Sequence, residues 1–77
     1  DTLGTALLRT GNSERAVTVF REALNADPTY DYALVGMAEA QLAVGNLDEA
    51  RSVLRRLRTP DPALAERVAK LRVALEG

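Results

Sequence analysis

Chemically reactive side chains are few in this sequence of 77 residues, and their spacing does not favour catalysis. The chain has no His and no Cys, and Ser13 and Ser52 are its only serines. A nucleophile needs a neighbouring base and zinc prefers imidazole or thiolate ligands, so neither site can be assembled from ordinary parts. The adjacent acids Asp48 and Glu49 lie in the first turn of an expected helix, where their negative charges interact favourably with the partial positive charge of the helix N-terminus. We therefore expect no enzymatic activity, no cofactor and no metal site.

A group of arginines in the second half of the chain is the next candidate site: Arg51, Arg55, Arg56 and Arg58. Positions 51, 55 and 58 fall on one face of a helix. Binding of nucleic acid would favour interleaved aromatic residues and a basic chain, but aromatics are 4% of the residues and the net charge is −1. We interpret the group as a solvated helix face, with an acidic protein partner as the alternative and no binding of nucleic acid.

The elements that must position these residues are repeated along the chain. The segment GNSERA at 11–16 returns as GNLDEA at 45–50, a shift of 34 residues. The same shift aligns Asp27-Pro28 with Asp61-Pro62, and it aligns apolar residues with apolar residues in the stretches that precede these pairs. Within each period the apolar residues recur with helical spacing, and strict alternation is absent. The sequence therefore predicts five helices and an all-α fold.

Glycine, asparagine, aspartate and proline residues indicate where these helices end and begin. In Gly11-Asn12 and Gly45-Asn46, glycine suits the left-handed conformation that ends a helix, because it lacks a Cβ. The asparagine side chain is then expected to cap the next helix. In Asp27-Pro28 and Asp61-Pro62, the aspartate is expected to cap a helix that has the proline at its first position.

This pattern resembles the tetratricopeptide repeat (TPR) family, in which helix-turn-helix repeats stack into a superhelical solenoid. The resemblance implies one domain with a truncated repeat at 1–27, a full repeat at 28–61 and a capping helix at 62–77. Small residues at positions 4, 16, 38 and 50 would let paired helices approach closely. The repeat signature comprises these residues: Gly4, Gly11, Ala16, Phe20, Ala23, Pro28, Ala38, Gly45, Ala50, Leu54 and Pro62.

Three residues depart from the family pattern or bear on the ends of the stack. Gln41 stands where the family usually has an aromatic residue, and Arg72 stands at the register of the small residues Gly4 and Ala38. A long charged side chain would keep a further helix away, so we expect the stack to stop at the capping helix. Asp1 falls inside a periodic apolar pattern, and the chain is therefore expected to be a fragment of a longer protein.

The family binds extended or helical peptides on a concave face formed by the first helix of each repeat. The resemblance therefore implies a scaffold or adaptor that binds a protein or peptide partner, and the mostly apolar face suits an amphipathic helix or apolar peptide. Self-association with a second copy is the alternative. Aspartate at position 32 or 35 is expected to abolish either association and leave the fold intact. By register, the candidate partner-binding residues are Thr5, Leu8, Arg9, Tyr32, Val35, Glu39, Leu42, Ala69 and Val73.

Chaperone-adaptor members of the family hold C-terminal carboxylates with a clamp of Lys, Asn and Arg side chains. Only Lys70 carries a suitable charge at the matching positions, whereas Asp1 and Glu66 would repel a carboxylate, so we expect no clamp activity. The full set of matching positions is Asp1, Thr5, Gly36, Glu66 and Lys70.

The composition also bears on where the protein works. No apolar run approaches the roughly 20 residues that a membrane-spanning helix needs, so we expect no membrane insertion. A chain without Cys suits either the cytoplasm or the periplasm, and we expect a soluble protein in one of these two compartments. The wealth of Ala, Leu and Arg is typical of bacteria with GC-rich genomes.

Overall fold

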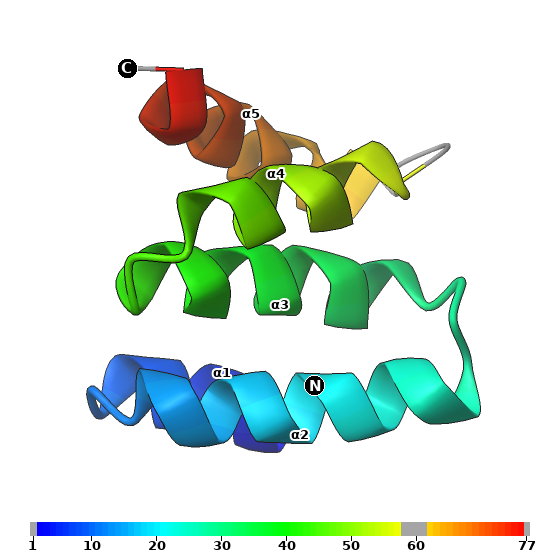
Figure 1. Ribbon diagram of the computed structural model, residues 1–77. Helices are drawn as coiled ribbons and strands as arrows, with labels where there is room; N and C mark the ends of the chain where they lie inside the picture. The colour runs from blue at the N-terminus through cyan, green and yellow to red at the C-terminus, as the bar shows by residue number, and fades with distance from the viewer. Residues whose placement is uncertain (1, 58–61, 77) are drawn as a thin grey trace.

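The computed structural model describes residues 2–57 and 62–76, without the side chains of Thr2 and Thr5. Its helices are α1 (Thr2–Arg9), α2 (Ser13–Ala26), α3 (Asp31–Ala43), α4 (Leu47–Arg55) and α5 (Pro62–Glu76). The described ranges contain no strand, which confirms the predicted all-α fold. In Figure 1 the chain zigzags upward from the α1–α2 hairpin through α3 to the α4–α5 pair.

The hydrophobic core surrounds α3, which packs against all four other helices. Because neighbours cover α3 on several sides, it is apolar almost all round, whereas α2 and α4 each keep a polar face. The small residues Ala16, Ala38 and Ala50 are 0% exposed, as expected where paired helices approach closely. The buried residues of α3 are Ala33, Leu34, Val35, Gly36, Met37, Ala38, Ala40 and Gln41.

Phe20 of α2 lies between two glycines that belong to different helices. Its side chain is 1% exposed. A Cβ added to Gly4 of α1 would lie 2.4 Å from Phe20 Cζ, and one added to Gly36 of α3 would lie 2.3 Å from the same atom. The close approach at Gly4 was predicted from the sequence, whereas the one at Gly36 was not. The signal for it was a glycine inside an apolar helical run.

The helix ends confirm the predicted conformation of the glycines but not the predicted capping by the asparagines. Gly11 and Gly45 have φ angles of +83° and +90°, the left-handed conformation that was predicted for them. The prediction of side-chain caps is wrong, because neither Asn12 nor Asn46 makes a capping hydrogen bond with its side chain. Instead, Asn46 Nδ2 donates to Gln41 Oε1 at 2.9 Å, back into the preceding helix.

The buried side chain of Gln41 gives the physical reason for this difference. Gln41 is 4% exposed, and its Nε2 lies 3.8 Å from Met37 Sδ. A buried amide oxygen without a hydrogen bond costs free energy. The side chain of Asn46 therefore donates to Gln41 and does not cap the start of α4. Asn12, in the other turn, has no such neighbour and donates to Thr10 Oγ1 at 3.2 Å in an exposed setting.

This arrangement predicts that the two equivalent asparagines contribute unequally to stability. Asn46→Ala would leave Gln41 Oε1 buried without its donor, and we expect the free energy of unfolding to fall by about 1–2 kcal/mol. Asn12→Ala is the matched control, for which we expect a change within about 0.5 kcal/mol. Urea unfolding followed by circular dichroism measures both. Equal losses would mean that both side chains act as ordinary caps.

The second repeat begins later than the sequence predicted. Pro28 was expected at the first position of a helix, but it lies in a turn, and α3 begins only after that turn. Asp27 Oδ1 accepts hydrogen bonds from Thr29, at 3.1 Å from its backbone nitrogen and 2.9 Å from its hydroxyl. Because this local turn occupies the carboxylate, Asp27 does not cap α3. At the other Asp-Pro pair α5 does begin at Pro62, and Asp61 lies outside the described residues.

The last helix, α5, buries a single stripe and leaves its other side open. It packs against α3 and α4. Arg72 is exposed, in contrast to the buried Gly4 and Ala38 at the same register of the earlier helices. The residues of the buried stripe are Leu64, Val68, Leu71 and Leu75.

Candidate functional site

The predicted partner-binding residues come from α1, α3 and α5, helices that contact one another in that order. Val73 of α5 is 72% exposed. The side chain of Thr5 lies outside the described part of the chain. We call the remaining accessible members the inner face: Leu8, Arg9, Tyr32, Glu39, Leu42, Ala69 and Val73.

Val35 does not belong to this surface. It is 0% exposed, because the helices around α3 cover it. Aspartate at this position would bury a charge without a partner and damage the fold. The expectation that Val35→Asp leaves the fold intact is therefore wrong, whereas Tyr32, which is only partly buried, remains a usable probe of the surface.

Glu39 is bound by Arg67 of α5, a residue that the sequence analysis did not single out. Arg67 Nε donates to Glu39 Oε2 at 3.1 Å, and Arg67 Nη2 donates to Glu39 Oε1. The hydrogen bond to Glu39 raises the pKa of Arg67, while partial burial opposes it. The two residues are 28 positions apart, and only the stacking of α5 on α3 brings them together.

This bidentate pair should link α5 to α3 more strongly than an ordinary surface pair. The side chains are 34% and 27% exposed, and arginine engages both carboxylate oxygens. A double-mutant cycle with Arg67→Ala and Glu39→Ala is expected to give a coupling of about 1 kcal/mol that weakens with salt. The open pair Lys70–Glu66, at 3.3 Å, is the control and should give about 0.3–0.5 kcal/mol. Equal couplings would contradict the special role of Arg67.

Two tyrosines extend this junction of α3 and α5. The ring centroids of Tyr30 and Tyr32 lie 6.1 Å apart with planes tilted by 52°, and Tyr30 is 36% exposed. Tyr32 also raises the pKa of Arg67 electrostatically, after the larger effects of Glu39 and of burial. Tyrosine and arginine are among the residue types that most often carry binding energy at protein interfaces.

The carboxylate-clamp positions remain poorly suited to a carboxylate in the folded chain. Lys70, the one matching cation, pairs with Glu66 on its own helix at 3.3 Å. Gly36 is buried against Phe20, and Asp1 lies outside the described residues. The absence of clamp activity stays a prediction.

The arginine group does not form the single solvated helix face that was predicted. The helix α4 ends at Arg55, and Arg56 lies in the turn that follows, where its Nη2 donates to the backbone oxygen of Pro28 at 3.2 Å. Arg58 lies outside the described residues. Two of these arginines are thus at the end of a helix or beyond it.

Arg51 of α4 has a structural contact with the last helix. Its Nη2 donates to the backbone oxygen of Leu75 at 2.7 Å, and its Nη1 lies 3.2 Å from Asp48 Oδ1. The last carbonyls of a helix lack partners within the helix, so this guanidinium satisfies one of them at the end of α5. Arg51 therefore connects α4 to α5 and is not a freely solvated side chain.

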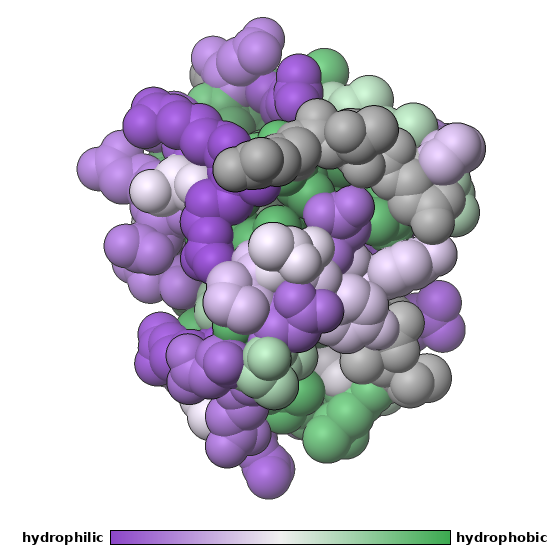
Figure 2. Space-filling view, turned by 90° about the vertical axis from the view of Figure 1, so that its right-hand side faces the viewer, coloured by the Kyte–Doolittle hydropathy of each residue, from purple (hydrophilic) through white to green (hydrophobic). Residues whose placement is uncertain are grey.

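The polarity of the surface differs between the sides of the molecule. Figure 2 views the structure from the right of Figure 1, so that the side of α2 and α4 lies on the left. Hydrophilic residues dominate that side, whereas hydrophobic residues reach the surface at several places on the opposite side. The more apolar side, which carries α1, is the better candidate for binding another chain.

Comparison with known proteins agrees with this geometry. Residues 7–75 match a family model described as tetratricopeptide repeat. No curated protein and no solved structure matched the chain. Within residues 2–57 and 62–76, no helix combines the length and hydropathy needed to cross a membrane.

Proposed function

Because the chain belongs to the tetratricopeptide repeat family, whose repeats generally mediate protein–protein interactions, we propose that it is a scaffold or adaptor module that binds a peptide or protein partner on its inner face. The proposed ligand is an amphipathic helix or an extended peptide with apolar side chains. It would lie across α1, α3 and α5, the first helices of the successive repeats.

The observation that supports this proposal is the apolar surface left partly open on α1, α3 and α5. Leu8 of α1 and Leu42 of α3 occupy the same register, 34 residues apart, and both are only partly buried. Val73 of α5 is 72% exposed on the next helix of the stack. Covering such surface is favourable by about 25 cal/mol for each Å² removed from water, so a partner with apolar side chains gains affinity there.

The charged residues of the inner face indicate how the proposed ligand would be oriented. Glu39 is neutralised locally by Arg67, so it does not repel an acidic ligand. Arg9, at the end of α1, is exposed and forms no ion pair with another described residue. A ligand with an acidic group near α1 and an apolar or aromatic group near Tyr32 therefore fits this face best.

A charge placed on the inner face tests the proposal. Peptides selected from a displayed library against the whole chain supply the probe, and Val73→Asp is expected to weaken their binding at least about tenfold. Asn25→Asp, at an exposed position of α2, changes the net charge equally and is expected to leave affinity unchanged. Both variants should keep the circular dichroism of the parent chain. Full binding to Val73→Asp, or a library that yields no binder, would contradict the proposal.

A second copy of the chain is the alternative occupant, and one exposed apolar residue supports it. Leu3 of α1 is 62% exposed, on the first helix of the stack. We expect a monomer when the solution mass is measured over a wide concentration range. A dimer that Val73→Asp dissociates would assign the inner face to self-association, whereas a dimer that Leu3→Asp dissociates would assign the contact to the open side of α1.

A further inference from the structure

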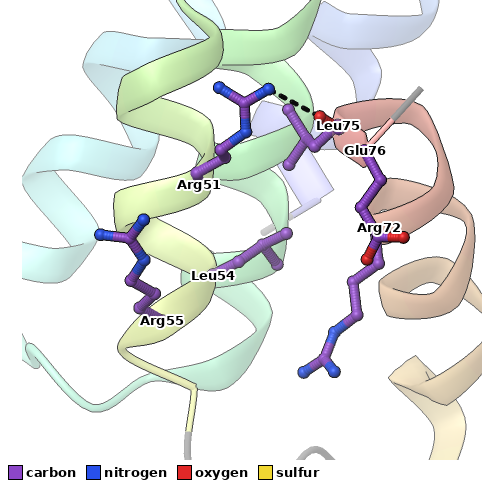
Figure 3. Close-up of a pocket in the computed structure, with 6 residues that line it drawn as sticks. All are labelled: Arg51, Leu54, Arg55, Arg72, Leu75 and Glu76. Atoms are coloured by element: carbon purple, nitrogen blue, oxygen red, sulfur yellow. Dashed lines mark hydrogen bonds between the residues drawn. The ribbon is translucent and has the colours of Figure 1, made fainter.

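A hollow of about 360 Å³ lies between α4 and α5, and none of its lining residues belongs to the inner face. Its floor is apolar, because Leu54 and Leu75 project between the two helices (Figure 3). These leucines are 7% and 4% exposed. The complete lining consists of Arg51, Leu54, Arg55, Arg72, Leu75 and Glu76.

The charge of this hollow is opposite to that of the whole chain. Three arginines line it against one carboxylate, that of Glu76, although the net charge of the chain is −1. Arg51 is occupied by the backbone oxygen of Leu75 and by Asp48. Arg55 of α4 and Arg72 of α5 are exposed, and their guanidinium groups form no hydrogen bond or ion pair with the residues that the structure describes. In Figure 3 the Arg55 side chain extends along the outer side of α4, away from α5.

The register of Arg72 shows what kind of surface could cover this side of α5. At the same register Gly4 lies against Phe20 of the following helix, and Ala38 is 0% exposed. On α5 this position carries an exposed guanidinium group. An ordinary apolar helix packed there would desolvate an unpaired charge, whereas a segment that brings carboxylates would pair with it.

We propose that the hollow binds an acidic amphipathic helix of a partner protein. An apolar side chain of that helix would cover Leu54 and Leu75, and its flanking carboxylates would pair with Arg55 and Arg72. Guanidinium groups bind carboxylates with two parallel hydrogen bonds, which makes arginine well suited to this contact. The apolar floor and the absence of an aromatic residue in the lining favour a peptide over a nucleic acid, which would stack its bases.

The test uses a defined peptide and a matched pair of double variants. The probe is a synthetic helical peptide of roughly 15 residues, with leucines on one face and glutamates beside them. In Arg55→Gln/Arg72→Gln, we expect its dissociation constant, measured by fluorescence anisotropy, to rise about tenfold or more. Arg15→Gln/Arg21→Gln removes the same charge from exposed positions of α2 and should leave it unchanged. Arg51 is kept in all variants because it holds the end of α5.

Three further measurements test the charge contact and separate this site from the inner face. Replacing the glutamates of the peptide by glutamine should weaken binding as much as the double variant does, and added salt should weaken it in the same direction. Amide chemical shifts should change on α4 and α5 when the peptide is added. Shift changes confined to α1 and α3 would place the peptide on the inner face and overturn the inference, without affecting the proposed function.

Other results would also overturn it. Equal affinity of the glutamate and glutamine peptides would mean that the hollow is only an apolar contact. No binding at millimolar peptide, or undiminished binding to Arg55→Gln/Arg72→Gln, would remove the site. Tighter binding of a short oligonucleotide than of the peptide would assign the arginines to phosphate groups instead.

Discussion

Phe20→Ala is expected to lower the free energy of unfolding by about 3–5 kcal/mol, the largest loss that we predict for a single substitution. The ring is 1% exposed and fills the contact where α1, α2 and α3 meet, since Gly4 and Gly36 both lie against it. Domains have about 0.05–0.15 kcal/mol of stability per residue, which gives this chain roughly 4–12 kcal/mol in total. Loss of the ring therefore removes a large share of the stability and can unfold the chain.

Urea unfolding followed by circular dichroism measures this effect. Leu3→Ala removes an apolar side chain that is 62% exposed, and as a control it should change stability by no more than about 0.5 kcal/mol. Phe20→Leu keeps an apolar group and should show an intermediate loss, which preserves the test if Phe20→Ala does not fold. Unchanged unfolding of Phe20→Ala would contradict the packing of this ring between the two glycines.

Gly36→Ala is expected to destabilise the chain by about 2–3 kcal/mol, although alanine normally stabilises a helix interior relative to glycine by about 0.5–1 kcal/mol. The added Cβ would lie 2.3 Å from both Cε1 and Cζ of Phe20. The ring cannot retreat towards α1, because it lies equally close to Gly4 on that side. Overpacking therefore outweighs the gain in helix propensity.

The same substitution in a Phe20→Leu background tests whether the loss comes from the contact with the ring. When Phe20 is first replaced by leucine, the aromatic atoms that would meet the new Cβ are gone. Gly36→Ala should then lose most of its destabilising effect and can become stabilising, because alanine has the higher helix propensity. The comparison is the difference in urea midpoint between the two backgrounds. An equal loss in both would show that Gly36 is needed for a reason other than its contact with Phe20.

The local chemistry of the chain was sufficient to predict the five helices of residues 2–57 and 62–76 and most of their ends. Apolar residues at helical spacing specify a buried face wherever the helix packs, so the helices could be recognised without knowing their neighbours. Gly11 and Gly45 end their helices through a property of the residue itself, its freedom to adopt a positive φ angle. The repeat of 34 residues also identified the family and the helices that carry the inner face.

Predictions that depended on competition between local partners were less accurate. Asn46 has a side chain that could cap a helix, but its amide nitrogen donates to the buried side-chain oxygen of Gln41. Asp27 was expected to cap a helix, but its carboxylate closes a turn with Thr29. The side chain types were read correctly, whereas the partner that each would choose depended on burial, which the spacing does not reveal.

Only the tertiary structure decided which candidate residues stay accessible and which hold the repeats together. Val35 is 0% exposed, and Glu39 is paired with Arg67 at a separation of 28 positions. Arg51 reaches the end of α5, and Gly36 receives the ring of Phe20 from another helix. Each contact joins helices that are distant in the sequence, so it follows from the stacking geometry and not from the period. The sequence by itself determined the helices and their order, and the packing between them determined which surfaces remain open.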